Sequence, residues 1–233
     1  MLLEICANSY QSAINAQKAN ADRIELCSAL SVGGLTPSYG LLHQISKEIT
    51  IPVHVLIRPR SGNFCYTDNE FQQMKSDITL CKKLGFKGIV SGILNKNNTL
   101  DIERTKELVE LSKPLSLTFH RAFDCVQNPE ETLLQLIDLG IDRVLTSGLK
   151  NKAIDGIETL KSLNNIANGK IGILPGSGIN TDNILAFKKA GFSEVHTSAS
   201  KVIKSSSVYF DKTMQTISDC ETIKQLLKII KSA

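Results

Sequence analysis

Apolar residues alternate with polar ones in short runs along the chain, and five runs carry an ionisable residue where a plain core strand would be aliphatic. They are LLEIC (2–6), RIELC (23–27), VHVLIR (53–58), SLTFHR (116–121) and EVHTS (194–198). An alternation of period two sends one set of side chains to an apolar layer and the other set to the opposite face. Because buried charge is costly unless it is paired, several such strands converging predict a built site.

Strand-like and amphipathic helical segments alternate from end to end, which predicts an α/β fold. Eight βα units in 233 residues favour a (β/α)8 TIM barrel, in which binding groups lie at the carboxyl ends of the strands. An open doubly wound sheet is the alternative, but no GxGxxG motif follows the first strand. The strand-like runs begin near Leu2, Asp22, Val53, Lys87, Leu115, Asp142, Lys170 and Glu194.

No linker or low-complexity tract divides the chain, so we expect one barrel domain over residues 1–233. The least regular segment lies near 198–217, and a C-terminal helix follows it. Residue types that favour helix N-termini predict where several helices begin. These caps are Thr67 with Glu70, Asn128 before Pro129, Asn180 or Thr181, and Ser218 with Glu221.

The same alternation sorts the strand residues by face, since the helix-facing set must be apolar. The fourth and sixth strands stay undecided between Gly88/Val90 and Ile89/Ser91, and between Leu145/Ser147 and Val144/Thr146. Barrel interiors are usually filled by Val, Ile and Leu, so a large ionisable set inside predicts a functional site. A purely structural pair of Glu25 with Arg58 is the alternative. The expected interior residues are Glu4, Cys6, Glu25, Cys27, His54, Leu56, Arg58, Thr118, His120, Glu194, His196 and Ser198.

Two loops that follow strands have the composition of anion sites. The loop RPRSGNFCYTD (58–68) carries two arginines, which suit an anion clamp. The loop LPGSGIN (174–180) carries two glycines ahead of a helix, where barrels often hold phosphate. The expected anion-binding residues are Arg58, Arg60, Ser147, Gly176, Gly178 and Ser198.

Composition narrows the range of partners. The net charge of +4 is spread without a basic block, so we expect no nucleic-acid binding. No signal peptide and no run of ~18 apolar residues is apparent, so we expect a cytoplasmic protein without membrane contact. Six cysteines without a CxxC pair indicate reduced thiols rather than disulfides or a structural zinc site.

Several segments, in order, resemble the signature blocks of the CutC copper-homeostasis family. Ser177 stands where the family usually has a glycine. The resemblance implies a (β/α)8 barrel, a cytoplasmic location, a part in copper handling and a homodimer or higher homo-oligomer, with Tyr209, Phe210 and the last helix as candidate contacts. Family copper binding has been associated with two cysteines, whose positions match Cys6 and Cys27. The blocks are ADRIELCSALSVGGLTPSYG (21–40), VLIRPRSGNFCYTDNE (55–70), LTFHRAFD (117–124), RVLTSG (143–148), LPGSGIN (174–180) and EVHTSAS (194–200).

The first functional hypothesis is a copper-binding protein. Cys6 and Cys27 are expected to point inward from neighbouring strands, about 5 Å apart. Soft thiolates suit Cu(I), and His54 is a possible third ligand. The thiols could instead be ordinary buried cysteines.

The second hypothesis is an enzyme that acts on a small phosphate, sugar or carboxylate. Arg58 and Arg60 would clamp the anion, His120 and Glu25 would form an acid–base pair, and His196 would orient the substrate or stabilise developing charge. A structural scaffold is a third reading, favoured if the barrel mouth is covered by its own loops.

Overall fold

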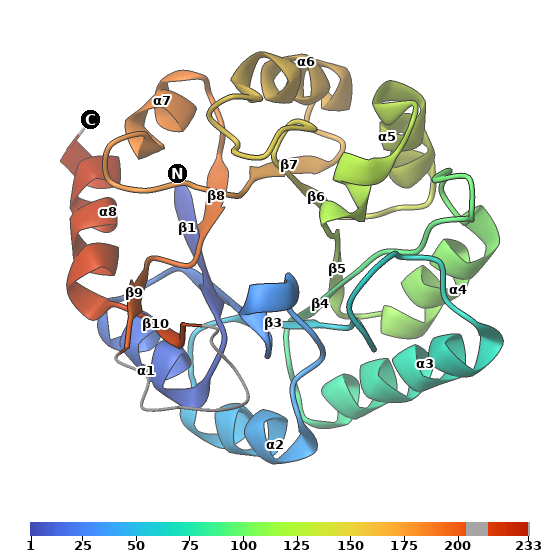
Figure 1. Ribbon diagram of the computed structural model, residues 1–233, viewed down its shortest axis with the longest axis horizontal. Coiled ribbons are helices and arrows are strands. Elements are labelled where there is room, and N and C mark those ends of the chain that lie inside the picture. Colours follow the sequence, from blue (N-terminus) through green and yellow to red (C-terminus); the bar gives the residue numbers. More distant parts are fainter. Residues whose placement is uncertain (204–213, 233) are drawn as a thin grey trace.

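The computed structural model describes residues 1–203 and 214–232, and its centre is a parallel β-barrel ringed by helices (Figure 1). Neighbouring strands pair in the order β7-β6-β5-β4-β3-β2-β1-β8, and all of these pairs are parallel. A parallel bridge between Gly176 and His196 closes the ring, which confirms the (β/α)8 TIM barrel. The strands are β1 (Leu2–Ala7), β2 (Arg23–Leu26), β3 (Val53–Leu56), β4 (Gly88–Ser91), β5 (Ser116–Phe119), β6 (Arg143–Thr146), β7 (Gly172–Pro175) and β8 (Glu194–Thr197).

The helices that cover the barrel begin largely where their sequences place caps. Thr67 and Glu70 form the predicted capping box of α3, and Pro129 is the first residue of α5. The α-helices are α1 (Tyr10–Lys18), α2 (Tyr39–Glu48), α3 (Asp68–Lys83), α4 (Ile102–Ser112), α5 (Pro129–Asp138), α6 (Ile157–Ala167), α7 (Ile184–Lys189) and α8 (Cys220–Ser232). Two short 3-10 helices follow β2 and β5: η1 (Leu30–Val32) and η2 (Arg121–Cys125).

Two predicted helix starts are wrong. Asn180 opens a separate turn, because it accepts a backbone hydrogen bond from Asn183, and α7 begins only after that turn. Ser218 belongs to a strand, and Asp219 caps α8 instead by accepting from the Thr222 amide at 3.1 Å.

The alternation along the strands sorts their side chains as predicted. Leu3 and Ile5 lie in the large apolar layer between barrel and helices, whereas Cys6, Cys27, Leu56 and Val90 form a separate cluster. Val90 therefore faces the barrel interior, which decides the face of β4 that the sequence left open. On β6, Leu145 lines the interior pocket described below, so the set of Leu145 and Ser147 faces the barrel interior.

An ionic network fills the barrel interior at the amino ends of the strands. Arg23 pairs with Glu4, and it also pairs with Glu194 at 2.7 Å. Arg143 reaches the same Glu194 at 3.2 Å. Buried carboxylates and guanidinium groups thus satisfy one another here, as buried charges must.

The predicted irregular segment near 198–217 contains a small antiparallel pair, β9 (Ser200–Val202) with β10 (Thr216–Ser218). Ser218 fastens this pair to the first βα unit: its amide donates to Ser12 Oγ at 3.1 Å and its hydroxyl to the Cys6 carbonyl at 3.4 Å. Tyr209 and Phe210 lie outside the described residues. Within the described ranges, no helix has the length and apolarity needed to cross a membrane.

Candidate functional site at the carboxyl ends of the strands

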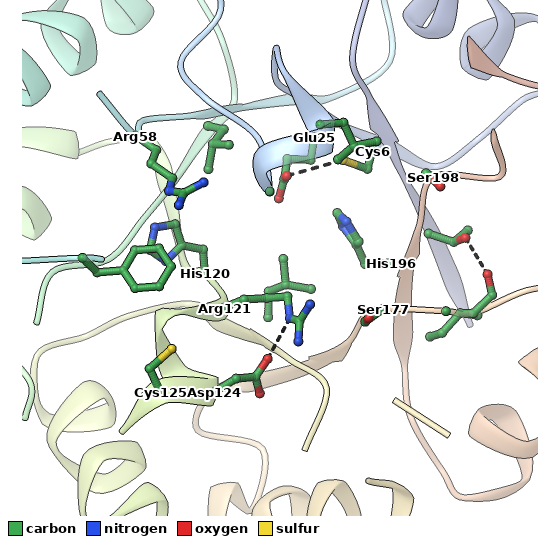
Figure 2. A pocket seen from close by; sticks show the side chains of 18 residues that line it. Cys6, Glu25, Arg58, His120, Arg121, Asp124, Cys125, Ser177, His196 and Ser198 are labelled. Atoms are coloured by element: carbon green, nitrogen blue, oxygen red, sulfur yellow. Dashed lines mark hydrogen bonds and ion pairs between the residues drawn. The ribbon is translucent and has the colours of Figure 1, made fainter. Parts of the chain in front are cut away.

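A pocket of about 530 Å³ opens at the carboxyl ends of the barrel strands (Figure 2). This volume lies in the usual range for small-molecule sites. Glu25, Arg58, His120 and His196 all line it, so the predicted convergence of these four side chains is confirmed. The other lining residues are Cys6, Leu30, Gly33, Leu56, Phe64, Arg121, Asp124, Cys125, Leu145, Ser177, Gly178, Ile179, Thr197 and Ser198.

Cys6 and Cys27 form a thiol pair on β1 and just after β2. Their Sγ atoms are 3.7 Å apart, well beyond the ~2.05 Å of a disulfide, so both are free thiols. Cys6 lines the pocket, whereas Cys27 is fully buried. The contact with Cys27, burial and the nearby charge of Glu25 raise the pKa of Cys6 well above its usual value.

Glu4 holds the ring of His196 from below the pocket. Its Oε1 lies 2.7 Å from His196 Nδ1. Burial alone would raise the pKa of Glu4, but the bond to His196 and the charge of Arg23 lower it well below its usual range. Burial would lower the pKa of His196, but the charges of Glu25 and Glu4 raise it. Nδ1–H of His196 therefore donates to Glu4, and Nε2 is left for the pocket.

Glu25 is nearly fully buried but poorly satisfied. Its Oε1 accepts a long contact from the Cys6 thiol at 3.8 Å, and its Oε2 has no partner. Burial, reinforced by the charge of Glu4, raises the pKa of Glu25 to about 7 against the opposing effect of His196. Cys6, Glu25 and His196 each offer a ligand atom within 4.8 Å of the others.

Arg58, just beyond β3, holds the loops around the pocket. Its Nη1 donates to the carbonyls of Val32 and Gly34 at 2.8 and 2.9 Å, and its Nη2 donates to that of Gly62 at 3.0 Å. The guanidinium also lies 5.1 Å from the Phe64 ring centroid. Glu25 instead contacts only the Cys6 thiol, so the alternative of a structural Glu25–Arg58 ion pair is wrong.

His120 ends β5 with a defined tautomer. Its Nδ1 accepts from the Ala122 amide at 3.2 Å, which places the proton of the neutral ring on Nε2. Burial and the charge of Arg58 lower the pKa of His120 to about 3. Its Nε2 is buried without a partner. The neutral ring of His120 thus offers an N–H donor at Nε2, and its predicted acid–base role stays a prediction.

The other predicted site residues divide between the pocket and its surroundings. Gly178 and Ser198 line the pocket. Arg60 does not, because its Nε pairs with Glu70 at 2.5 Å, so the predicted clamp of two arginines does not form. Ser147 is engaged outside the pocket, donating to Asp124 at 3.0 Å. Gly176 makes the barrel-closing bridge beside the pocket.

His54 lies lower in the barrel, away from the thiol pair. A side chain at Gly88 would come within 2.6 Å of the His54 ring, so this ring packs directly against the glycine. Burial, with the charges of Arg23 and Arg143, lowers the pKa of His54 to about 4 against the effect of Glu4. His54 is outside the Cys6, Glu25 and His196 group, as Cys27 also is, and His54 as a third metal ligand stays a prediction.

Sequence reasoning missed one conspicuous part of the pocket wall, the η2 helix. Its Arg121 and Asp124 pair at 2.7 Å. Asp124 also accepts from the amides of Ser147 and Leu149, which ties the loop after β5 to the loop after β6. The HRAFD segment held the signal, an arginine and an aspartate three residues apart directly after a strand.

Comparison with known proteins identifies the family of this chain. The CutC family matches residues 1–201. The chain belongs to the CutC family. A CutC family protein of Edwardsiella ictaluri (strain 93-146) is 46% identical over 209 residues, 90% of this chain and 83% of the relative. A CutC family protein of Salmonella agona (strain SL483) is 44% identical over 221 residues, 94% of this chain and 88% of the relative.

Solved structures agree with this membership. A copper homeostasis protein CutC from Streptococcus agalactiae has a TM-score of 0.80 and 36% identity, covering 85% of this chain and 98% of that one. Thiamine phosphate pyrophosphorylase from Pyrococcus furiosus has a TM-score of 0.62 at 15% identity, covering 99% and 96%. The second likeness shows only that CutC shares its barrel with enzymes.

Proposed function

We propose that this CutC protein binds Cu(I) through Cys6 and Cys27 as part of copper handling. The main support is the pair of free thiols, whose Sγ atoms are 3.7 Å apart. Cys6 lines the pocket, and Cys27 lies directly behind it. Thiolates are the ligands that Cu(I) prefers. The name of the Streptococcus agalactiae relative, a copper homeostasis protein, supports the same reading.

His196 is a candidate additional ligand beside Cys6, whereas Cys27 contacts Cys6 but lies outside the group of Cys6, Glu25 and His196. Its Nδ1 is bound to Glu4 at 2.7 Å, the arrangement by which a carboxylate commonly orients a metal-binding imidazole. One ligand atom each of Cys6, Glu25 and His196 lies within 4.8 Å of the other two, which supports a role for His196 in metal binding. Because the Cys6 thiol must lose a proton to bind, we expect the affinity for copper to rise with pH.

Replacing both thiols tests the copper proposal. In an anaerobic Cu(I) titration against a chromophoric chelator, we expect the Cys6→Ser, Cys27→Ser double variant to lose one equivalent of tightly bound copper. Cys220→Ser is the matched control, because Cys220 is a half-buried thiol on α8, away from the pocket. An unchanged stoichiometry in the double variant would rule the proposal out.

We also propose a cytoplasmic homodimer or higher homo-oligomer. Six free cysteines support a reducing compartment. Exposed apolar side chains near the β9–β10 pair, Val202, Ile203 and Met214, support an interface on that side. Sedimentation velocity would test the assembly: a monomer across micromolar concentrations contradicts it.

A second candidate function is acid–base chemistry on a small anionic substrate. The specific observation that favours it is a pocket of about 530 Å³, far larger than one ion needs, with Glu25 Oε2 and His120 Nε2 both unpartnered in its wall. Glu25 would exchange the proton, while His120, as a neutral donor, and His196 would stabilise charge on a substrate oxygen. Turnover of a hydroxy or oxo acid that Glu25→Gln abolishes would support this function, and turnover that survives Glu25→Gln would contradict it.

A further inference from the structure

Arg58 is a buried cation without a buried anion beside it. Its side chain lines the pocket with only 6% of the residue exposed. Within residues 1–203 and 214–232, no carboxylate lies within ion-pair distance of its guanidinium. The three carbonyls that it contacts carry partial charge only, so its full positive charge is left uncompensated. Buried charges in proteins are otherwise paired.

The hydrogen-bonding capacity near Arg58 is also incomplete. Arg58 Nε and His120 Nε2 are both buried donors without a partner, and the buried Tyr66 hydroxyl next to Arg58 is unpartnered as well. Arg58 and His120 contact the same Phe64 ring, whose centroid lies 5.1 Å from the guanidinium carbon and 4.8 Å from the His120 ring centre. Unsatisfied buried donors are rare because each costs about 1–3 kcal/mol. Two of them on one side of one pocket point to an acceptor that a ligand brings.

The His120 ring cannot turn to hide its donor. Its Nδ1 accepts a hydrogen bond from the Ala122 amide, which fixes the orientation of the ring. The ring also packs against Gly92, because a side chain at that position would come within 2.6 Å of it. Arg58 lies near enough to keep the ring neutral, and the neutral ring donates only through Nε2. Figure 2 shows Arg58 and His120 together on one side of the pocket, away from Cys6 and Glu25.

We propose that Arg58 and His120 form an anion subsite that binds the carboxylate of a small organic acid. One uncompensated positive charge matches a monoanion, because the neighbouring Arg121 is already paired with Asp124. The carboxylate of Glu25 in the same pocket disfavours a phosphate dianion. Leu30, Leu56 and Leu145 offer apolar surface to the carbon skeleton of the acid. This inference rests on the second candidate function for its location, and it is independent of copper.

The test is isothermal titration of the copper-free protein with acetate, lactate, glycerate and inorganic phosphate, at constant ionic strength. We expect saturable binding of at least one carboxylate and weaker binding of phosphate. His120→Asn keeps an acceptor for the Ala122 amide but no longer places a donor at the Nε2 position, so it should weaken carboxylate binding about tenfold to a hundredfold. His43→Asn, on α2 outside the pocket, should bind like the unchanged protein.

Three results would overturn the inference: no saturable carboxylate binding, tighter binding of phosphate than of any carboxylate, or undiminished binding by His120→Asn. Because His120→Asn could in principle perturb folding, Arg58→Lys provides a second variant that keeps the charge but loses Nε, and it should also weaken binding about tenfold. Binding without turnover would leave the inference standing while removing the second candidate function.

Discussion

Two buried histidine rings, one in the pocket wall and one below it, have strongly lowered pKa values. His120 and His54 are both almost fully buried, and burial lowers their pKa values to about 3 and about 4. Each ring lies against a glycine at one end of β4, Gly88 at its start for His54 and Gly92 just after its end for His120, where any side chain would approach to 2.6 Å. These two glycines thus make room for one neutral ring on β3 and one directly after β5.

The depressed pKa of His120 predicts a pH dependence of stability. The unfolded chain takes up a proton on this histidine near pH 6.5, but the folded protein does so only near pH 3. Stability is therefore lost as the pH falls through this window, by up to about 1.4 kcal/mol per pH unit for this group. Urea unfolding at pH 7, 6, 5 and 4 should show a shallower acid loss for His120→Asn than for the unchanged protein.

Other groups with shifted pKa values also contribute to this pH dependence, His54 and Glu25 among them, so the test is the difference between His120→Asn and the unchanged protein. His54 adds a loss of the same sign, whereas Glu25, with its pKa raised to about 7, loses stability in the opposite direction as the pH rises from about 4.5 to about 7. Both remain in His120→Asn, and their contributions cancel in the difference. Parallel pH curves for the two proteins would contradict the burial argument for His120.

At the scale of elements, the start of α3 determines where the β3 loop goes. Thr67 Oγ1 accepts from the Glu70 amide at 3.3 Å, and Glu70 Oε2 accepts from the Thr67 amide at 2.7 Å. The other oxygen of Glu70 pairs with Arg60. One glutamate therefore caps the helix and fastens the loop that carries Arg58 and Phe64.

Removing this glutamate should cost more than removing a surface charge. We expect Glu70→Ala to lower the free energy of unfolding by clearly more than one surface ion pair contributes, because the return bond of the capping box and the Arg60 pair are lost together while Thr67 still caps the helix. Glu107→Ala is the matched control, since Glu107 makes a surface ion pair with Lys75 between α3 and α4, and it should cost at most about 0.5 kcal/mol. Equal losses in chemical denaturation would show that the cap does not stabilise the loop.

Local patterns predicted what depends on neighbours in sequence. Period-two alternation identified the eight strands and the convergence of Glu25, Arg58, His120 and His196, because both follow from strand geometry alone. The alternation could not show that Arg58 lines the pocket whereas Arg60 does not, because only the fold brings Glu70 to Arg60.

The tautomer of His120 was equally hidden, since it depends on a turn that presents the Ala122 amide. Arg23 shares its face with Glu25 by the same alternation and was overlooked. Its partners are Glu4 and Glu194, and Glu194 also pairs with Arg143 from across the barrel, which no local pattern reveals.

Across the whole molecule, the ionic network at the amino ends joins strands that are distant in sequence. Glu194 on β8 receives Arg23 from β2 and Arg143 from β6, and Arg23 also pairs with Glu4 on β1. The side chains of this network are at most 17% exposed. The network therefore connects opposite walls of the barrel beneath the pocket.

Breaking this network should destabilise the barrel strongly. Glu194→Gln leaves two buried guanidinium groups with less compensation, and we expect a loss of about 3–5 kcal/mol in the free energy of unfolding. Glu158→Gln, which removes a surface carboxylate paired with Lys161 on α6, should change it by less than about 0.5 kcal/mol. Thermal and urea denaturation of both variants measure the difference, and a Glu194→Gln loss as small as the control's would refute the proposed importance of the network.

The hydrogen bond from Ser218 to the Cys6 carbonyl has a consequence for synthesis of the chain. Both thiols of the pair leave the ribosome early, but the backbone of Cys6 gains this bond only from a residue 212 positions later. During translation the surroundings of Cys6 are therefore complete only after β8 has paired with β1 and Ser218 has been added. Metal or oxidant encountered in that interval would meet a more open thiol pair than the one in the finished barrel.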